Sequence, residues 1–194
     1  MDLTSITPTP TALRALAHPT RLRMLGLLRL EGPATATSLA ARLGLNTGAT
    51  SYHLRQLAKH GFVEEDSTRG NARERWWRAA HQATRTDAES YADQGAQDTF
   101  DAYLQAVAVV YTQRLQRAVE ERGLLPRQWR KASTYSDWGL RLTPARAREL
   151  SEALATLVEG WDEEPDAGDA GEFIVHLLAF PEPGTVTGVA EDRR

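Results

Sequence analysis

The sequence predicts a mainly α-helical protein with a small β component, an α+β fold, and three observations predict it. Four short stretches before residue 61, and one long stretch over about residues 96–121, repeat apolar residues at helical spacing. Two short extended stretches flank a glycine turn near residue 70. A last segment, about residues 137–181, is predicted to form a strand, a helix and a second strand.

Composition is that of a globular protein, because 41% of the 194 residues are hydrophobic and 25% are charged. The sequence contains no cysteine, which excludes disulfides, thiolate metal sites and cysteine nucleophiles and favours a reducing cytoplasm. The first residues lack a basic region followed by an apolar core, so we expect no signal peptide. The densest apolar run, which starts at Ala106, is too short to span a bilayer.

Charge is distributed unevenly along the chain. Residues 1–80 hold 11 Lys+Arg against 6 Asp+Glu, whereas residues 81–194 hold 12 against 20. A basic half suggests contact with a polyanion, and the acidic half then serves another purpose. Chance variation of the net charge around zero would also explain a basic excess of this size.

The first two helices are marked by leucines and by proline. Leu13 and Leu16 share one side of the first helix, and Pro19 suits the first position of the second helix. Leu22, Leu25 and Leu28 continue the pattern up to Gly32-Pro33, where it stops.

Two further helices are joined by a very short turn. Thr35 or Thr37 is the expected N-cap of the first, and Gly44 is its expected C-cap. The second begins after Asn46 and ends at Gly61; its predicted inner face consists of Thr50, Leu54 and Leu57. Two short helices joined by a glycine-containing turn form a helix-turn-helix.

Residues 62–77 change from helical to alternating spacing. "FVEED" and "ARERWW" are predicted strands on either side of "STRGN", in which Gly70 and Asn71 tolerate a positive φ. The result is a β-hairpin directly after the helix-turn-helix, which defines a winged helix. We therefore divide the chain into a winged helix-turn-helix DNA-binding domain, residues 1–82, and a C-terminal region, residues 83–194.

The C-terminal region starts with a polar linker and the long helix of about residues 96–121. Its apolar stripe is too wide for one neighbour, so part of it is expected to form a subunit contact. The predicted dimerisation residues are Phe100, Leu104, Val107, Tyr111 and Leu115. Beyond them, "DWGLRL" and "EFIVHLLAF" are the predicted strands, the second near-continuously apolar and therefore expected to be buried.

The outward face of the helix that follows Asn46 is suited to DNA. It consists of small, hydrogen-bonding or basic residues: Thr47, Gly48, Ser51, Tyr52, Arg55 and Lys59. Small residues let a helix approach the major groove, and Arg55 is the best candidate for bidentate contact with guanine. A phosphate contact by Arg55 would look the same in sequence, and any surface helix can carry such residues.

The hairpin supplies the more specific signal, a set of cations and an amide that could reach the DNA backbone or the minor groove: Arg69, Asn71, Arg73 and Arg75. The alternative is that the arginines form cross-strand ion pairs with Glu64, Glu65 and Asp66. We expect some pairing and expect Arg69, near the tip, to stay free.

These blocks resemble a known family. "LRALAHPTRLRMLGLL", "TSLAARLGLNTGATSYHLRQLAKHGFVEE" and the arginine-rich hairpin ending in "WWR" are similar to the ArsR (arsenical-resistance repressor) family of winged-helix bacterial transcription regulators. The resemblance covers about Ala12 to Ala79. It implies a homodimeric repressor on a near-palindromic double-stranded operator, with Thr47, Ser51, Tyr52 and Arg55 at base-reading positions.

Metal sensing, which the family resemblance would allow, is disfavoured. Cysteine is absent, and the five histidines, His18, His53, His60, His81 and His176, do not have ligand spacing. We expect no metal and no cofactor. The sequence also lacks a nucleophile–base pair, a phosphate loop and a dinucleotide fingerprint, so an enzyme is not expected.

Three alternatives to a plain regulator remain. In the first, Trp129, Tyr135, Trp138 and Trp161 line a small-molecule effector pocket that controls DNA binding, although they would equally fill a small core. In the second, the winged helix is an accessory to an enzyme. In the third it binds protein, which the arginines of the hairpin argue against.

Overall fold

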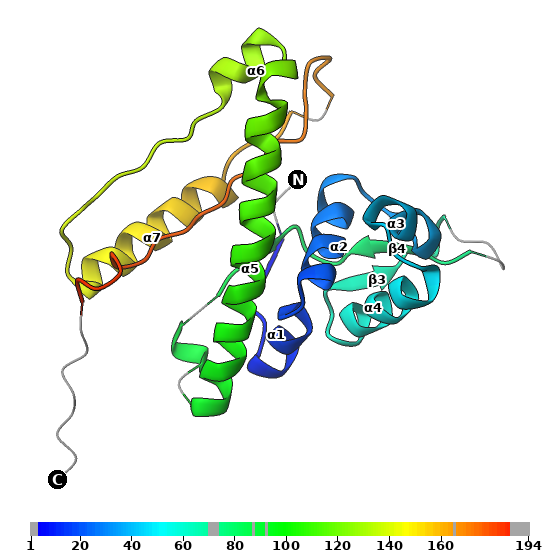
Figure 1. The fold of residues 1–194 in the computed structure, drawn as a ribbon, viewed down its shortest axis with the longest axis horizontal. Coiled ribbons are helices and arrows are strands. Elements are labelled where there is room, and N and C mark those ends of the chain that lie inside the picture. The colour runs from blue at the N-terminus through cyan, green and yellow to red at the C-terminus, as the bar shows by residue number, and fades with distance from the viewer. Residues whose placement is uncertain (1–3, 70–73, 87, 92, 165, 187–194) are drawn as a thin grey trace. The chain divides into compact units, whose positions relative to one another are not determined.

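The fold is known from a computed structural model that describes residues 4–69, 74–86, 88–91, 93–164 and 166–186 (Figure 1). The chain divides into two compact units between Tyr135 and Ser136. The long helix packs against the first two helices, so the N-terminal compact unit extends beyond the winged helix-turn-helix domain predicted for residues 1–82.

Four helices open the N-terminal unit, as predicted, and each is capped by a side chain that accepts a hydrogen bond from a backbone N–H. The caps are Thr9, His18, Thr35 and Asn46. The helices are α1 (Pro10–Leu16), α2 (Pro19–Leu30), α3 (Ala36–Leu43) and α4 (Thr47–Lys59).

Helix α3 and the turn that follows it have the predicted capping residues. Thr35 and Ser38 form a reciprocal capping box at the start of α3. Gly44 ends α3 with a φ of 66°, in the left-handed region, and its N–H donates to the carbonyl of Ala40. This left-handed residue sets the direction in which α4 leaves the turn.

The hairpin forms as predicted, and its return strand extends past the predicted end at Trp77. Strand β3 (Val63–Glu65) pairs antiparallel with β4 (Trp76–Ala79), so the return strand begins at Trp76 and runs past Trp77. A third strand, β2 (Ala34–Thr35), pairs with the other edge of β4. The sheet order is therefore β2-β4-β3, and Trp77 lies buried on the central strand.

Residues expected to be a polar linker contribute a second, smaller sheet. Strand β1 (Ser5–Ile6) pairs in parallel with β5 (Ala83–Thr84). This pairing ties the start of the chain to the segment that enters a short 3₁₀ helix, η1 (Ala88–Tyr91). The Tyr91 hydroxyl donates to the carbonyl of Pro8 at 2.8 Å, which adds a second tie between the same two segments.

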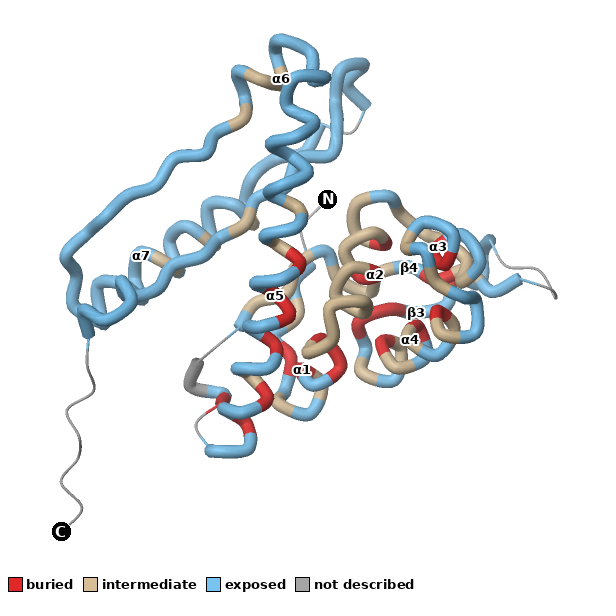
Figure 2. Tube along the Cα trace, in the orientation of Figure 1, coloured by how far each residue is buried: buried red, intermediate tan, exposed pale blue. Residues whose placement is uncertain are grey.

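The core lies where α1, α2, α4 and the sheet meet, and Figure 2 shows its buried positions in red. Its centre is a group of side chains with no exposed surface: Leu13, Leu16, Met24, Leu25, Leu54, Leu57 and Phe62. Burying each of these stabilises the fold by about 1.5–3 kcal/mol relative to leaving it exposed.

The long helix α5 (Gln94–Glu121) exists as predicted, and its inner face includes Val107 of the predicted stripe and the residues Tyr103 and Val110 that widen the stripe. The face is turned away from Leu104 and Leu115, which are exposed. The buried residues are Ala96, Thr99, Tyr103, Ala106, Val107 and Val110. Small residues at three of these positions let α5 approach α1 closely, and this contact sets the rotation of the helix.

The five predicted dimerisation residues consequently divide between two environments. Val107 is buried in its own unit, and Phe100 and Tyr111 pack, partly buried, against the same core. Leu104 and Leu115 expose 43% and 52% of their surface. Only these two remain available as an outward apolar contact.

Arg29 connects α2 to the segment that precedes α5. Its guanidinium donates to the carbonyl of His81 and to Oγ1 of Thr84, both at 2.8 Å. Burial lowers the pKa of Arg29 to about 10, and burial raises the pKa of nearby Tyr103. Arg29 therefore stays charged and Tyr103 neutral at physiological pH.

The end of α5 continues as a 3₁₀ turn, η2 (Arg122–Leu124), and α6 (Arg127–Ala132). In the second unit, α7 (Pro144–Glu159) has the predicted N-cap Thr143 and Pro144 at its first position. The two flanking strands were predicted wrongly: in the described residues neither 137–142 nor 172–180 pairs as a strand, and the second is not buried. A strand requires a continuous ladder of hydrogen bonds to a neighbour, and the alternating or apolar pattern alone does not provide one.

We predict that Gly44→Ala destabilises the protein, because an L side chain at a φ of 66° is strained. The expected loss in the free energy of unfolding is about 1 kcal/mol, measured by urea denaturation. Gly123→Ala is the matched control, since a Cβ meets no atom within 4 Å at either position and only Gly44 has a positive φ. Equal stability of the two variants would contradict the role of the left-handed turn.

Candidate nucleic-acid interface

Helix α4 presents one face to the core and one to solvent. Thr50, Leu54 and Leu57 have no exposed surface, and the Thr50 hydroxyl donates to the carbonyl of Asn46 at 3.1 Å. The opposite face carries the residues proposed for DNA contact: Thr47, Gly48, Tyr52, Arg55 and Lys59 are exposed, and Ser51 is partly exposed. The structure therefore brings all six predicted helix residues onto one accessible side.

The first turn of α4 is compact. Asn46 accepts the N–H of Ala49 through its side-chain oxygen at 2.8 Å, which satisfies one of the otherwise unpaired amides. A Cβ at position 48 would lie 3.4 Å from that oxygen, so glycine fits closely there. Helix N-termini attract phosphate through their free amides and dipole, and no bulky side chain screens this one.

Behind Tyr52 lies a pair of histidines that sequence reasoning treated as scattered. The rings of His18 and His53 are 4.8 Å apart, and Tyr52 meets His53 edge-on at 5.6 Å. Burial lowers the pKa of both histidines, and Arg21 lowers them further. The Nδ1 atom of His18 accepts the N–H of Thr20, so this ring also caps α2. These two uncharged rings pack behind Tyr52, at the junction between the start of α2 and the first half of α4.

The cations of the hairpin are paired with acids. Arg69 lies 3.7 Å from Asp66, Arg75 lies 3.8 Å from Glu65, and Arg78 lies 2.7 Å from Glu64. The prediction that Arg69 stays free is wrong, because Asp66 is only three residues away across the turn. Both partners of the Arg75 and Arg78 pairs are about half exposed or more, so these two pairs contribute little to stability.

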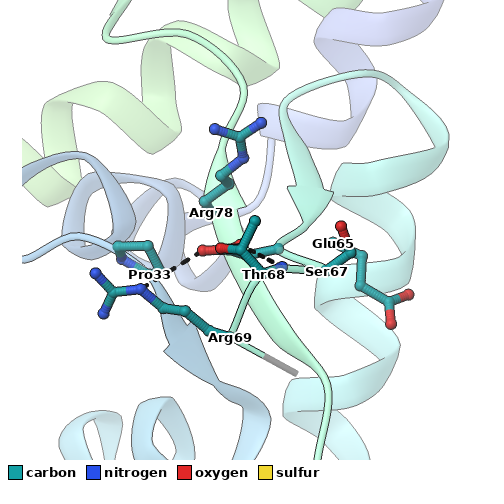
Figure 3. Close-up of a pocket in the computed structure, with 7 residues that line it drawn as sticks. Pro33, Glu65, Ser67, Thr68, Arg69 and Arg78 are labelled. Carbon is teal, nitrogen blue, oxygen red and sulfur yellow. Dashed lines mark hydrogen bonds and ion pairs between the residues drawn. The ribbon is translucent and has the colours of Figure 1, made fainter. Parts of the chain in front are cut away.

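Asp66 organises the turn that leads to the hairpin tip, a role that the sequence did not reveal. Its carboxylate accepts the hydroxyl of Thr68 at 2.6 Å and the N–H of Thr68 at 3.1 Å. The hydroxyl is the main reason that the pKa of Asp66 lies below its usual range. A hollow of about 280 Å³ adjoins this turn (Figure 3), lined by Pro33, Glu65, Asp66, Ser67, Thr68, Arg69 and Arg78.

The charge of the hairpin is balanced, in contrast with α4. Between residues 64 and 78 the sequence has four arginines and four acidic residues, whereas α4 has Arg55 and Lys59 and no acid. The predicted contacts Asn71 and Arg73 lie outside the described residues. Within the described part of the chain, the basic character of this surface therefore comes from α4.

The four aromatic residues of the predicted effector pocket are split between the two units. Trp129 and Tyr135 belong to the N-terminal unit, and Trp138 and Trp161 to the other. Trp138 and Trp161 expose 79% and 71% of their surface. Side chains this exposed do not enclose a ligand within their own unit, since pockets bury most of a ligand's surface.

In the part of the chain that the structure describes, histidine and acidic side chains form no group of three that could hold a metal ion. Among the described helices, none is both long enough and apolar enough to cross a membrane.

A helix-turn-helix followed by a hairpin, with a basic outward helix face, defines the class of winged helix-turn-helix DNA-binding proteins. A comparison with protein families agrees: residues 16–66 match the family described as a helix-turn-helix domain. The match covers α2, α3, α4 and β3, the elements that position the interface.

Solved structures that are similar to this chain include those of two proteins. One is a doubly substituted mutant of ZitR from Lactococcus lactis in apo form, with 16% identity, a TM-score of 0.31, and 72% of this chain and 80% of that chain covered. The other is RV1404 from Mycobacterium tuberculosis, with 17% identity, a TM-score of 0.30, and coverage of 79% and 86%. No curated protein matches the chain.

We predict that acidification weakens the junction behind Tyr52. Because the pKa values of His18 and His53 are lowered in the fold, their stabilising contribution is complete above the unfolded value of about 6.5. It is lost as the pH falls through the folded values. His53→Phe keeps a ring and removes one titrating group, so its thermal unfolding temperature should fall less between about pH 7 and pH 5 than that of the unmodified protein. An identical pH dependence would contradict this.

Proposed function

We propose that the protein is a sequence-specific regulator of transcription that binds double-stranded DNA as a homodimer, represses, and does not sense metal. The observation that carries the proposal is the arrangement of α4, which buries Thr50, Leu54 and Leu57 completely and turns a basic, acid-free face to solvent. The helix-turn-helix match over residues 16–66 supports the same class.

The proposed contact places α4 in the major groove. Thr47 and Gly48 lie at the N-terminal end, where a small surface lets the backbone approach. Ser51 and Tyr52 supply hydroxyl groups to base edges, and Arg55 supplies a guanidinium with the geometry for guanine. Lys59, at the far end of the helix, is placed for a phosphate.

The hairpin has a secondary role in this proposal. Arg69 and Arg75 reach phosphate only by giving up contacts of 3.7 and 3.8 Å with Asp66 and Glu65. The Arg75–Glu65 pair is exposed on both sides, and such pairs contribute about 0–1 kcal/mol, so its exchange has a small cost. Asp66 is buried but keeps its hydrogen bonds from Thr68 when Arg69 leaves. The acids nevertheless remain near the DNA and repel it, which limits the net gain in affinity.

Homodimerisation follows from how such helices read DNA. Two α4 helices related by a two-fold axis enter successive major grooves about 34 Å apart. Leu104 and Leu115 lie on the same side of α5, eleven residues apart, and are exposed, so they are the remaining candidates there from the predicted contact. The proposal includes no cofactor and no catalytic activity.

Selection of bound fragments from random DNA tests the function directly. We expect enriched sites with two half-sites separated by about one helical turn. Failure to enrich any sequence, together with failure to retain any DNA at low salt, would overturn the proposed function.

We predict that Arg55→Ala weakens binding to the selected site by about 1–3 kcal/mol, roughly 5- to 150-fold, if Arg55 reads a base. The affinity for unrelated DNA should change much less, as measured by fluorescence anisotropy at fixed salt. Arg127→Ala, which removes the same charge from exposed α6, is the control. An equal loss on all sequences, with a shallower salt dependence, would assign Arg55 to a phosphate instead.

We also predict that Glu65→Gln strengthens non-specific binding, because it releases Arg75 and removes a negative charge beside the DNA. The slope of log affinity against log salt should become steeper by up to about 0.9, the value for one added phosphate contact. Glu152→Gln on α7 makes the same charge change elsewhere. A slope identical to that of the control would show that the hairpin does not meet phosphate.

A further inference from the structure

Arg29 lies in the last turn of α2, on the face of that helix that meets α5. Gly26 and Arg29 share this face, since they are three residues apart. A Cβ at Gly26 would lie 2.9 Å from a guanidinium nitrogen of Arg114 on α5, so glycine lets the two helices approach closely there. Tyr103 of α5 is near enough to Arg29 to interact with its charge.

The guanidinium of Arg29 holds the segment that joins the hairpin to α5. Its Nε donates to the carbonyl of His81, and its Nη2 donates to Oγ1 of Thr84, both at 2.8 Å. In the described part of the chain Arg29 forms no ion pair, so this partly buried cation depends on neutral acceptors. Because an unpaired buried cation is unfavourable, the segment is held where its acceptors meet the guanidinium.

The same segment is also tied to the start of the chain. The N–H groups of Gln82 and Ala83 donate to the carbonyl of Thr4 at 2.9 and 3.1 Å, and β5 pairs with β1. These first residues lead into α1, which packs against α5. Residues 81–84 are therefore bound both to α2 and to the N-terminal segment shortly before α5 begins at Gln94.

Apolar packing and hydrogen bonds constrain this junction in different ways. The inner face of α5 includes Ala96 and Ala106, and burial of apolar surface has no preferred direction. The guanidinium of Arg29 is planar, with its N–H groups in a fixed fork, so it defines a direction as well as a distance. Helix α2 packs against both α4 and α5. Arg29 therefore connects the position of α4 with the path by which the chain enters α5.

We propose that Arg29 is a positioning residue for DNA recognition: it fixes the orientation of α4 relative to α5 and so determines which separation of half-sites the protein accepts. The inference rests on the homodimer of the proposed function, in which α4 enters the groove and α5 carries the partner contact. Each added base pair displaces a half-site by about 3.4 Å and rotates it by about 35° around the duplex. A dimer with a fixed orientation of α4 therefore fits one separation much better than its neighbours.

A purely structural role for Arg29 makes a different prediction. Loss of stability alone lowers the folded fraction, so it weakens binding to every DNA site in the same proportion. Loss of orientation leaves the contact of one α4 with one half-site unchanged. It weakens only the discrimination between operators whose half-sites are differently spaced.

Two variants remove the hydrogen bonds while keeping the size and charge of the junction nearly constant. Arg29→Lys keeps a cation but lacks the fork that reaches both acceptors, and Thr84→Val replaces one acceptor hydroxyl by a methyl group. The matched controls are Arg127→Lys on α6 and Thr86→Val in the same segment, both at exposed side chains. Fluorescence anisotropy gives the affinity for one half-site and for operators spaced one or two base pairs closer or farther, at a temperature at which all variants are folded.

We expect the unmodified protein and both controls to prefer one separation at least tenfold over its neighbours. Arg29→Lys should lower this preference by roughly tenfold, the effect of losing a hydrogen bond to a charged group, and should change half-site affinity less than twofold. Thr84→Val should lower it less, because the bond to His81 remains. An unchanged preference in both variants, or an equal loss of affinity for the half-site and all operators, would overturn the inference.

The orientation is also measured without DNA. The chain has no cysteine, so Lys59→Cys on α4 and Gln113→Cys on α5 introduce two thiols for spin labels. Labelled protein diluted in excess unlabelled protein gives the distance within one chain, which should broaden or shift with Arg29→Lys and stay the same with Arg127→Lys. An identical distribution in Arg29→Lys would overturn the inference. Absence of DNA binding by the unmodified protein would instead overturn the proposed function, and the half-site role with it, before any variant is compared.

Discussion

The packing of α4 onto the core is the constraint on which the rest of the interface depends. Leu54 and Leu57 lie completely buried beside Phe62, and successive residues of a helix turn by about 100°. Once these leucines face inward, Tyr52 and Arg55 must face outward. The left-handed Gly44 and the cap Asn46 then determine where the helix begins. Stability and DNA recognition therefore share the same packing, and a change in the core would move the recognition surface.

Much of this arrangement follows from local sequence. Caps and leucine spacing predict α2, α3 and α4, because each signal acts within a few residues. The rotation of α5 does not follow, since the stripe through Phe100 and Leu104 is as apolar as the one actually buried. Close approach to α1 favours the face that carries Ala96 and Ala106, and such an effect of a distant helix cannot be seen in spacing alone.

The pairing of charged residues in the hairpin likewise cannot be predicted from the sequence alone. The sequence shows the arginines and the acids, but which of them pair depends on a register that places Trp77 opposite Glu65 and Arg78 opposite Glu64. Asp66 acts as the acceptor of a tight turn, so it meets Arg69 at the place where a free cation was expected. In the proposed complex, a hairpin whose charges balance adjusts affinity only slightly, and sequence discrimination is left to α4.

In the C-terminal unit the sequence pattern predicts more structure than the chain forms. Its pattern describes a sheet with a buried central strand, whereas in the described residues neither run forms a strand and 172–180 is not buried. Such a pattern is stable only if another surface completes it, because an open apolar edge otherwise pairs indiscriminately.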